Sequence, residues 1–163
     1  MRGSFFGLML VLVLLLAPTE SSAQYRNSVG VRLGVTNGIN YKAFLKPRQA
    51  LEVSVTTSWN GVIMTGLWEW HTDFTKPLQI STGNFEGYLS LGTHYGAYGA
   101  ESPLYEGTGG GFDAGMGFEY RFDQIPFSLG VDYHFMADLQ LSGGSTSPNL
   151  LADLGLNLRY LFR

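Results

Sequence analysis

The chain has 163 residues, a formal net charge of −3 and no cysteine. Its length suggests one domain, and so small a charge gives no reason to expect a nucleic-acid partner. Without cysteine, neither a disulfide nor thiol chemistry is available to this protein. Its 22 glycines and 14% aromatic residues, set against few of the Lys, Glu and Ala residues that fill helices, favour an all-β fold.

The first 23 residues have the pattern of a secretory signal peptide. Arg2 precedes an apolar run over residues 5–17, and small residues lie just before Gln24, as at a signal-peptide cleavage site. The apolar run is shorter than the roughly 20 residues that a helix needs to cross a bilayer, which disfavours a membrane anchor. We therefore expect residues 1–23 to be a cleaved signal peptide and residues 24–163 to form a domain outside the cytoplasm.

Eight segments of alternating apolar and polar residues follow, separated by turn residues. The connections TNG, KPRQ, NG and DQIP are tight, whereas those around residues 73–84, 99–110 and 138–148 are longer and rich in Gly, Ser, Thr and Pro. This rhythm predicts an all-β, eight-stranded antiparallel up-and-down barrel. Its strands are expected at residues 28–35, 39–45, 50–59, 62–72, 85–98, 111–122, 127–137 and 149–162.

Each segment has one apolar face and one face that carries the charged residues, which are Arg32, Lys42, Glu52, Glu69, Asp113, Glu119, Arg121, Asp132, Asp153 and Arg159. Alternation alone does not decide which face points inward. The interior of an eight-stranded barrel is just wide enough to be filled by side chains, and the apolar faces carry too many large residues to fit there. The charged faces, by contrast, are rich in glycine and serine, which leave room for their neighbours. We therefore predict a transmembrane barrel in which Trp68 and Trp70 face lipid and Glu52 and Glu69 face the lumen.

Aromatic residues gather near the predicted strand ends. They are Trp59, Trp68, Trp70, Tyr95, Tyr98, Phe112, Tyr120, Phe122, Phe127, Phe135, Tyr160 and Phe162. Amphipathic rings of transmembrane barrels form girdles at both membrane interfaces, so this distribution predicts two girdles here.

The end of the chain, NLLADLGLNLRYLFR, has apolar residues at alternate positions, including Leu156, Leu158 and Tyr160, and closes on Phe162. It resembles the C-terminal assembly signal of Gram-negative outer-membrane β-barrels, except that Arg163 follows where an aromatic residue is usually last. With the signal peptide and the eight strands, the whole mature chain is similar to the small eight-stranded outer-membrane barrel family. The resemblance implies a monomer in the outer membrane, with outer-membrane lipids and the barrel assembly machinery as its partners.

Turn geometry predicts which charges meet in the lumen. A two-residue Asn60-Gly61 turn would place Glu52 opposite Glu69, and a three-residue loop over residues 36–38 would place Arg32 opposite Lys42. The turn at residues 46–49 would place Lys42 near Glu52 or Ser54. Because directly opposed like charges are destabilising, the cations must reach carboxylates on adjacent strands. We predict a belt of Arg32, Lys42, Glu52 and Glu69, within a structural network that also includes Glu119, Arg121, Asp132, Asp153 and Arg159.

Candidates for chemistry are few. His71, His94 and His134 all fall on the inward face, but His71 and His94 are expected at opposite ends of the barrel, so the three cannot ligate one metal ion. A lipid deacylase of the outer membrane would need a His-Ser pair facing lipid, and the spacing for one is absent. A charged lumen also disfavours an acyl pocket of the palmitoyltransferase kind. We expect no catalytic residue, no cofactor, no metal ion and no enzymatic activity.

The pattern thus favours a structural or surface-interaction protein whose exposed loops vary most. Loops 99–110 and 138–148 would be extracellular, with Glu101, Tyr105 and Glu106 as candidate contacts, and residues 73–84 would be a periplasmic turn. A water-filled pore is not expected, because eight strands leave little open lumen. Two alternatives remain open, a lipid-modifying outer-membrane enzyme and a soluble secreted lipocalin-like binding barrel.

Overall fold

The computed structural model describes residues 25–58, 61–99, 106–141 and 149–163. The predicted signal peptide at residues 1–23 lies outside these ranges, as do Asn60 of the predicted turn and the candidate contacts Glu101 and Tyr105. Within the described ranges, no helix is long and apolar enough to cross a membrane.

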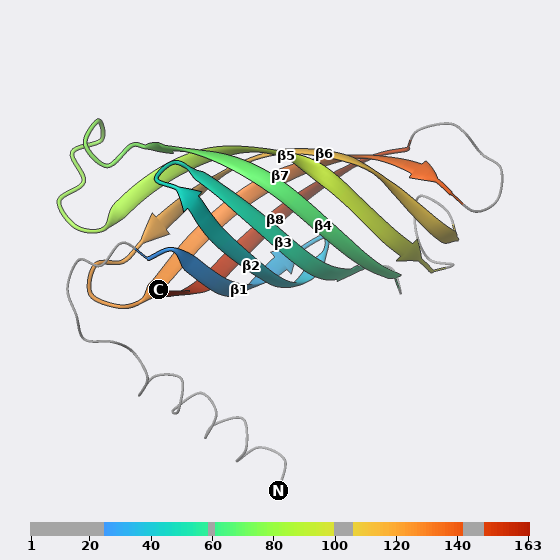
Figure 1. The fold of residues 1–163 in the computed structure, drawn as a ribbon, viewed down its shortest axis with the longest axis horizontal. Coiled ribbons are helices and arrows are strands. Elements are labelled where there is room, and N and C mark those ends of the chain that lie inside the picture. Colours follow the sequence, from blue (N-terminus) through green and yellow to red (C-terminus); the bar gives the residue numbers. More distant parts are fainter. Residues whose placement is uncertain (1–24, 59–60, 100–105, 142–148) are drawn as a thin grey trace, which may run out of the picture.

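Eight antiparallel strands follow one another around a closed barrel, which confirms the predicted architecture. They are β1 (Asn27–Gly34), β2 (Asn37–Lys46), β3 (Gln49–Ser58), β4 (Gly61–Asp73), β5 (Asn84–Tyr98), β6 (Gly107–Arg121), β7 (Phe127–Gln140) and β8 (Asn149–Phe162). The barrel closes where β1 pairs with β8, from Asn27 opposite Phe162 to Gly34 opposite Gly155. The strands cross the barrel obliquely (Figure 1), as closure of a sheet into a barrel requires.

The two ends of the barrel differ in their connections. At the terminal end, on the left of Figure 1, β1 begins, β8 ends, and the chain passes from β2 to β3, β4 to β5 and β6 to β7. At the loop end, the chain passes from β1 to β2, β3 to β4, β5 to β6 and β7 to β8. The wall is taller on one side, because β5 and β6 each have 15 residues whereas β1 has 8.

Apolar side chains cover the outside of the barrel and polar side chains fill the inside. On β8, Leu156 is 62% exposed, whereas the next residue, Asn157, is 2% exposed. The same alternation runs along the other strands, and buried apolar side chains such as Ile63 and Leu67 share the interior with the charges. This is the orientation that the volume argument predicts.

One predicted girdle residue is placed wrongly by the sequence pattern. Tyr98 points inward and is 4% exposed, because it is in phase with His94, which is also buried on β5. Alternate residues of a strand share one face, so the strand phase overrides the expectation that an aromatic residue near a strand end faces outward.

Two hairpin registers also differ from the prediction, each by a small slip along the strands. Between β3 and β4, Ser58 pairs with Gly61 and Glu52 lies opposite Leu67, so Glu52 and Glu69 are not directly opposed. An even slip keeps every side chain on its face, so the assignment of inside and outside is unaffected.

Between β1 and β2, Arg32 lies opposite Gly38 and not opposite Lys42. The physical reason is in the turn. The guanidinium of Arg32 donates to the backbone oxygen of Thr36 at 3.1 Å and to its hydroxyl at 2.8 Å, and Asn37 accepts a bond from the Gly34 amide at 3.1 Å. These bonds centre the turn two residues earlier than the predicted loop.

The long strands extend further toward the loop end than the sequence indicates. β6 begins at Gly107 and β7 ends at Gln140, whereas the predicted strands covered residues 111–122 and 127–137. Residues 107–110 are three glycines and a threonine, a composition that is typical of a loop. They form a strand because residues of β5 up to Tyr98 pair with them through the backbone, with Tyr98 opposite Gly107.

We predict that a cysteine pair at Val31 and Leu158 will cross-link β1 to β8, because these two residues are direct partners and both side chains face outward. The chain has no cysteine of its own, so mild oxidation or a short thiol linker followed by denaturing electrophoresis will detect the closed species. The matched control is Val31 with Leu154, which is on the same face of β8 but four residues along, a rise of about 13 Å. Equal cross-linking of both pairs would contradict the register of closure.

Candidate functional site: the charged lumen

The largest group of buried charges lies in the lumen near the terminal end. The Nζ of Lys42 is 2.8 Å from a Glu69 carboxylate oxygen, 3.3 Å from Glu119 and 3.4 Å from Glu52. The guanidinium of Arg159 reaches Glu52 at 2.7 Å and Glu119 at 3.0 Å. Lys42 and Arg159 are both 0% exposed. The five residues come from β2, β3, β4, β6 and β8, so this central cluster ties five strands together across the lumen.

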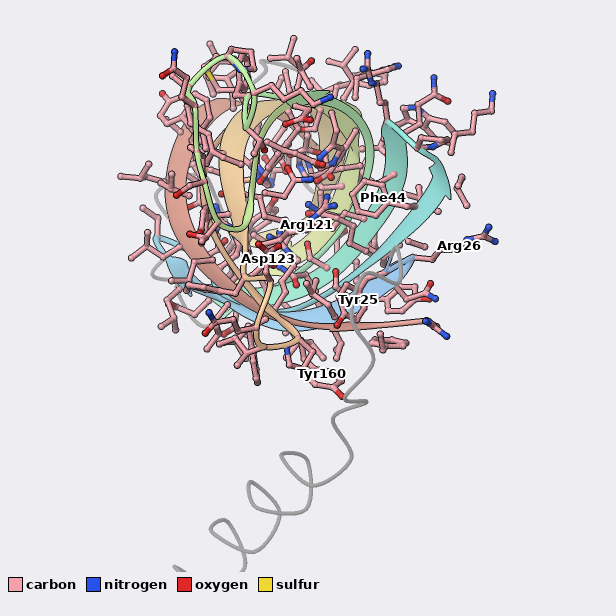
Figure 2. All side chains as sticks on the ribbon, turned by 90° about the vertical axis from the view of Figure 1, so that its left-hand side faces the viewer. Tyr25, Arg26, Phe44, Arg121, Asp123 and Tyr160 are labelled. Atoms are coloured by element: carbon pink, nitrogen blue, oxygen red, sulfur yellow. The ribbon has the colours of Figure 1, made fainter. Side chains whose placement is uncertain are left out.

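This central cluster continues to the mouth at the terminal end. His71 lies between two carboxylates, 2.8 Å from Glu69 and 3.0 Å from Glu86, and Arg121 reaches Glu86 at 2.6 Å and Glu119 at 3.1 Å. The Phe44 ring packs against these groups, with its centroid 4.8 Å from that of the tilted His71 ring and 4.7 Å from the Arg121 guanidinium. Figure 2 looks into this mouth, with Phe44 and Arg121 inside the wall.

A second cluster is built around Arg32 on β1. Its guanidinium is 2.7 Å from Asp132 of β7 and 2.7 Å from Asp153 of β8. The Thr36 hydroxyl donates to Asp153 at 2.5 Å, and the Asn157 amide donates to Asp132. Arg32 therefore joins β1 to the last two strands and reinforces the closure of the barrel.

A third cluster lies toward the loop end and involves no lysine or arginine. The two ring nitrogens of His94 are each 2.8 Å from a carboxylate oxygen, one from Asp113 and one from Asp138. The Tyr98 hydroxyl donates to the same Asp138 oxygen at 2.5 Å. Because a carboxylate only accepts hydrogen bonds, an imidazolium ring with N–H on both nitrogens satisfies both contacts of His94.

Small residues make the space that these side chains occupy. A Cβ added to Gly155 would lie 2.4 Å from the guanidinium carbon of Arg32, and a Cβ added to Gly30 would lie 2.6 Å from the Cγ of Arg159. Each glycine lies in the wall directly beside a buried arginine. At these two positions, glycine is therefore explained by close packing against the cations.

The described lumen holds more carboxylates than fixed cations. The four cations are Arg32, Lys42, Arg121 and Arg159, and the eight carboxylates are those of Glu52, Glu69, Glu86, Glu119, Asp113, Asp132, Asp138 and Asp153. Each of the three histidines lies within 4.0 Å of a carboxylate, His134 at 3.8 Å from Asp132. The histidines therefore lie where the unbalanced negative charge is.

The structure brings together some of the sequence-predicted residues and separates others. Lys42, Glu52 and Glu69 of the predicted belt meet, together with Glu119, Arg121 and Arg159. Arg32 does not join them and pairs with Asp132 and Asp153. Of the residues predicted to form an assembly signal, Leu156 and Leu158 face outward, and the Tyr160 and Phe162 rings stack at 6.3 Å at the terminal end.

The sequence argument left several lumen residues out of the network. Glu86, Asp113 and Asn157 lie on the inward phase of their strands, so the same alternation that identified the others could have included them. Asp138 was expected in a loop, and only the added length of β7 brings it to His94.

The charged side chains of the lumen are paired with one another, and we find no arrangement of a metal site or of an activated nucleophile among the described residues. Among the described residues, no group of three His, Cys, Asp or Glu side chains could hold a metal ion. The buried hydroxyl of Ser90 has no hydrogen-bond partner, whereas a serine nucleophile needs a base within hydrogen-bond reach.

Comparison with solved structures finds one fold of the same kind. The N-terminal β-barrel domain of Pseudomonas aeruginosa OprF superposes with a TM-score of 0.60 and 14% sequence identity, over 85% of this chain and 100% of that one. No protein-family model and no curated protein sequence matches the chain. At this identity the similarity shows the shared barrel fold alone.

We predict that Glu119→Gln will lower the free energy of unfolding by about 3–5 kcal/mol, the usual cost of removing one partner from a buried ion pair. The carboxylate contacts Lys42, Arg159 and Arg121, so an amide of the same shape leaves three cations undercompensated. Denaturant unfolding in detergent, followed by circular dichroism, measures the change. The control is Glu106→Gln at an exposed position, expected to change stability by less than about 0.5 kcal/mol. Equal stability of the two variants would mean that the network contributes nothing.

We also predict that Gly155→Ala will lower the free energy of unfolding by about 1–3 kcal/mol, because the new methyl group displaces the Arg32 guanidinium from its two aspartates. Gly66→Ala is the matched control, since a Cβ there has nothing within 4 Å. The same denaturant titration separates the two variants. If Gly155→Ala were as stable as Gly66→Ala, the position of Arg32 would not depend on this glycine.

Proposed function

We propose that the chain is an outer-membrane β-barrel protein with a structural or surface-interaction role, whose lumen is filled by a charged side-chain network that holds the barrel together. The observation that carries this proposal is that the polarity of the barrel wall is opposite to that of a soluble protein. Large apolar side chains face outward on every strand while charged side chains are buried. In water such an extended apolar surface is a liability, whereas in a bilayer it is required.

The backbone satisfies the other requirement of a bilayer. Every strand has two hydrogen-bonded neighbours, because β1 pairs with β8. A closed barrel leaves no sheet edge to be exposed to hydrocarbon.

A hollow of about 490 Å³ on the outer wall, lined by residues that include Trp70, Leu91, Ala114 and Phe135, has the size and apolar lining to take a lipid acyl chain.

The proposed location in the outer membrane rests on the sequence. The signal-like residues 1–23 and the final strand, with Leu156, Leu158, Tyr160 and Phe162, both resemble features of exported outer-membrane barrels. We propose that the barrel assembly machinery recognises this strand and that the protein is a monomer surrounded by outer-membrane lipids. We place the loop end of the barrel on the extracellular side. Glu106, which precedes β6 and is exposed, is then available there for contact with a partner.

The alternatives fit the same geometry less well. A soluble lipocalin-like barrel needs its apolar face inside, and the charged face lies there. A lipid-modifying enzyme needs an activated nucleophile near lipid. The buried Ser90 hydroxyl lies in the lumen, has Gly115 between it and His134, and makes no hydrogen bond to a histidine.

Expression of the full chain in a Gram-negative host, followed by membrane fractionation and electrophoresis with and without boiling, tests the proposal. We expect the protein in the outer-membrane fraction and a shift in mobility on boiling, because a folded barrel resists the detergent of the gel until it is heated. Recovery in the aqueous fraction without detergent would overturn the proposal in favour of the soluble alternative.

A pair of variants tests the depth of the wall in the membrane. Leu91→Arg, at the middle of β5, should reduce stability in vesicles by about 2–4 kcal/mol, and Leu45→Arg, near the terminal end of β2, by about 0–1 kcal/mol. Both side chains face outward and are exposed to a similar degree, 56% and 55%. In a soluble barrel the two substitutions would have equal and small effects.

A further inference from the structure

The exposed basic residues of the described chain all lie at one end of the barrel. Arg26 precedes β1, Lys46 ends β2, Arg48 follows it in the turn, Lys76 lies between β4 and β5, and Arg163 follows β8. All five lie at the terminal end. The connections at the loop end, residues 35–36, 59–60, 99–106 and 141–148, contain no lysine or arginine in the sequence.

These basic residues, here called the basic rim, are not held in salt bridges with the described residues, although the exposed Asp73 carboxylate is close enough to Lys76 and Arg48 to interact with both electrostatically. In the described part of the chain, no salt bridge involves any of the five. The two exposed carboxylates at this end are engaged with the backbone, Asp73 with the Thr75 amide at 2.8 Å and Asp123 with the Gly83 amide at 2.6 Å. Five cationic side chains against two carboxylates leave a positive surplus that faces outward.

An aromatic band lies on the outer wall next to the rim. Tyr160 is 6.3 Å from Phe162 and 5.5 Å from Phe127, measured between ring centroids, and Tyr41 is 6.4 Å from Phe162. On the neighbouring strands, Phe85 and Phe118 stack at 5.6 Å. Amphipathic rings lie at the headgroup level of a bilayer. The band therefore places the adjacent basic side chains at the depth of the lipid phosphates.

Figure 2 shows the direction of these side chains. Arg26 points away from the barrel on the outer side of the wall, whereas Arg121 lies inside the mouth. Arg121 is thus a lumen residue, paired with Glu86 and Glu119, whereas Arg26 belongs to the rim and faces the surroundings.

We propose that the basic rim binds the phosphate groups of anionic phospholipids in the leaflet around the terminal end. The proposal rests on the membrane location proposed above. Long basic side chains reach along a barrel wall to the headgroup region, and each one near an anionic surface contributes roughly a fivefold gain in affinity at moderate salt. The loop end, with no basic residue in its connections, has no corresponding preference.

Trp70 provides a local probe of the rim. It faces outward on β4 opposite Gln49, the residue next to Arg48. In the background Trp59→Phe and Trp68→Phe it is the sole tryptophan, because the chain has three. The full mature chain is refolded into vesicles of phosphatidylcholine that contain a fixed fraction of either brominated phosphatidylglycerol or brominated phosphatidylcholine, and quenching of Trp70 by each is compared.

We expect brominated phosphatidylglycerol to quench Trp70 several-fold more effectively than brominated phosphatidylcholine at the same mole fraction. At about 1 M salt, where the Debye length is about 3 Å, the difference should disappear. It should also disappear in the triple variant Lys46→Gln, Arg48→Gln and Lys76→Gln, whose heat-modifiable band shows that it is folded. These three side chains are exposed and lie outside the lumen network.

A second tryptophan position controls for the location of the effect. Val62→Trp, in a background with Trp59, Trp68 and Trp70 all replaced by Phe, places the probe on the same strand but at the loop end, where Val62 is exposed. No preference for the anionic lipid is expected there. Equal quenching of Trp70 by both lipids, a preference that survives the triple substitution, or an equal preference at position 62 would each overturn the proposal. Absence of quenching by either lipid would contradict the membrane location itself, and the rim proposal with it.

Discussion

The contacts of Lys42 and Arg159 with three glutamates are the constraint on which the rest of the barrel depends. Both cations are fully buried, and a buried charge is tolerated only when partners of opposite charge surround it closely. Those partners, Glu52, Glu69 and Glu119, lie on three other strands. Neighbouring strands are joined by backbone hydrogen bonds, but only such cross-lumen contacts relate strands that are not neighbours. The central cluster therefore requires a closed wall of a particular diameter.

The composition of the wall follows from this requirement. A narrow lumen that holds arginine side chains must have little else on its surface, and Gly30 and Gly155 lie where a methyl group would collide with Arg159 and Arg32. The apolar side chains that a soluble protein would bury are consequently on the outside, where they form the surface that we propose to be in contact with lipid. Because the lumen is narrow, small residues such as glycine are frequent on the charged face, and large apolar residues are on the other face.

The two ends of the barrel have different chemistry although the strands between them are alike. The terminal end combines the Phe44 and Arg121 mouth, the aromatic band around Tyr160 and Phe162, and the basic rim. Toward the loop end, the lumen contains the cluster of His94, Asp113 and Asp138, in which neither aspartate is paired with a lysine or an arginine. This asymmetry gives the barrel a direction, which a uniform cylinder in a bilayer would lack.

The sequence by itself determined the number of strands, the face that each strand turns outward and most of the inward charges, because these depend on a period of two residues and on the volume of the interior. It determined only in part which charges meet: Lys42 lies opposite Glu52, as the turn between them indicates. Arg32 was expected beside Lys42, but the turn at Thr36 and the pairing of β1 with β8 bring it to Asp132 and Asp153. Likewise Asp138, expected in a loop, reaches His94 because β6 and β7 continue as strands beyond the apolar pattern. Register and closure are set by hydrogen bonds between segments far apart in the chain, and only the tertiary structure decides them.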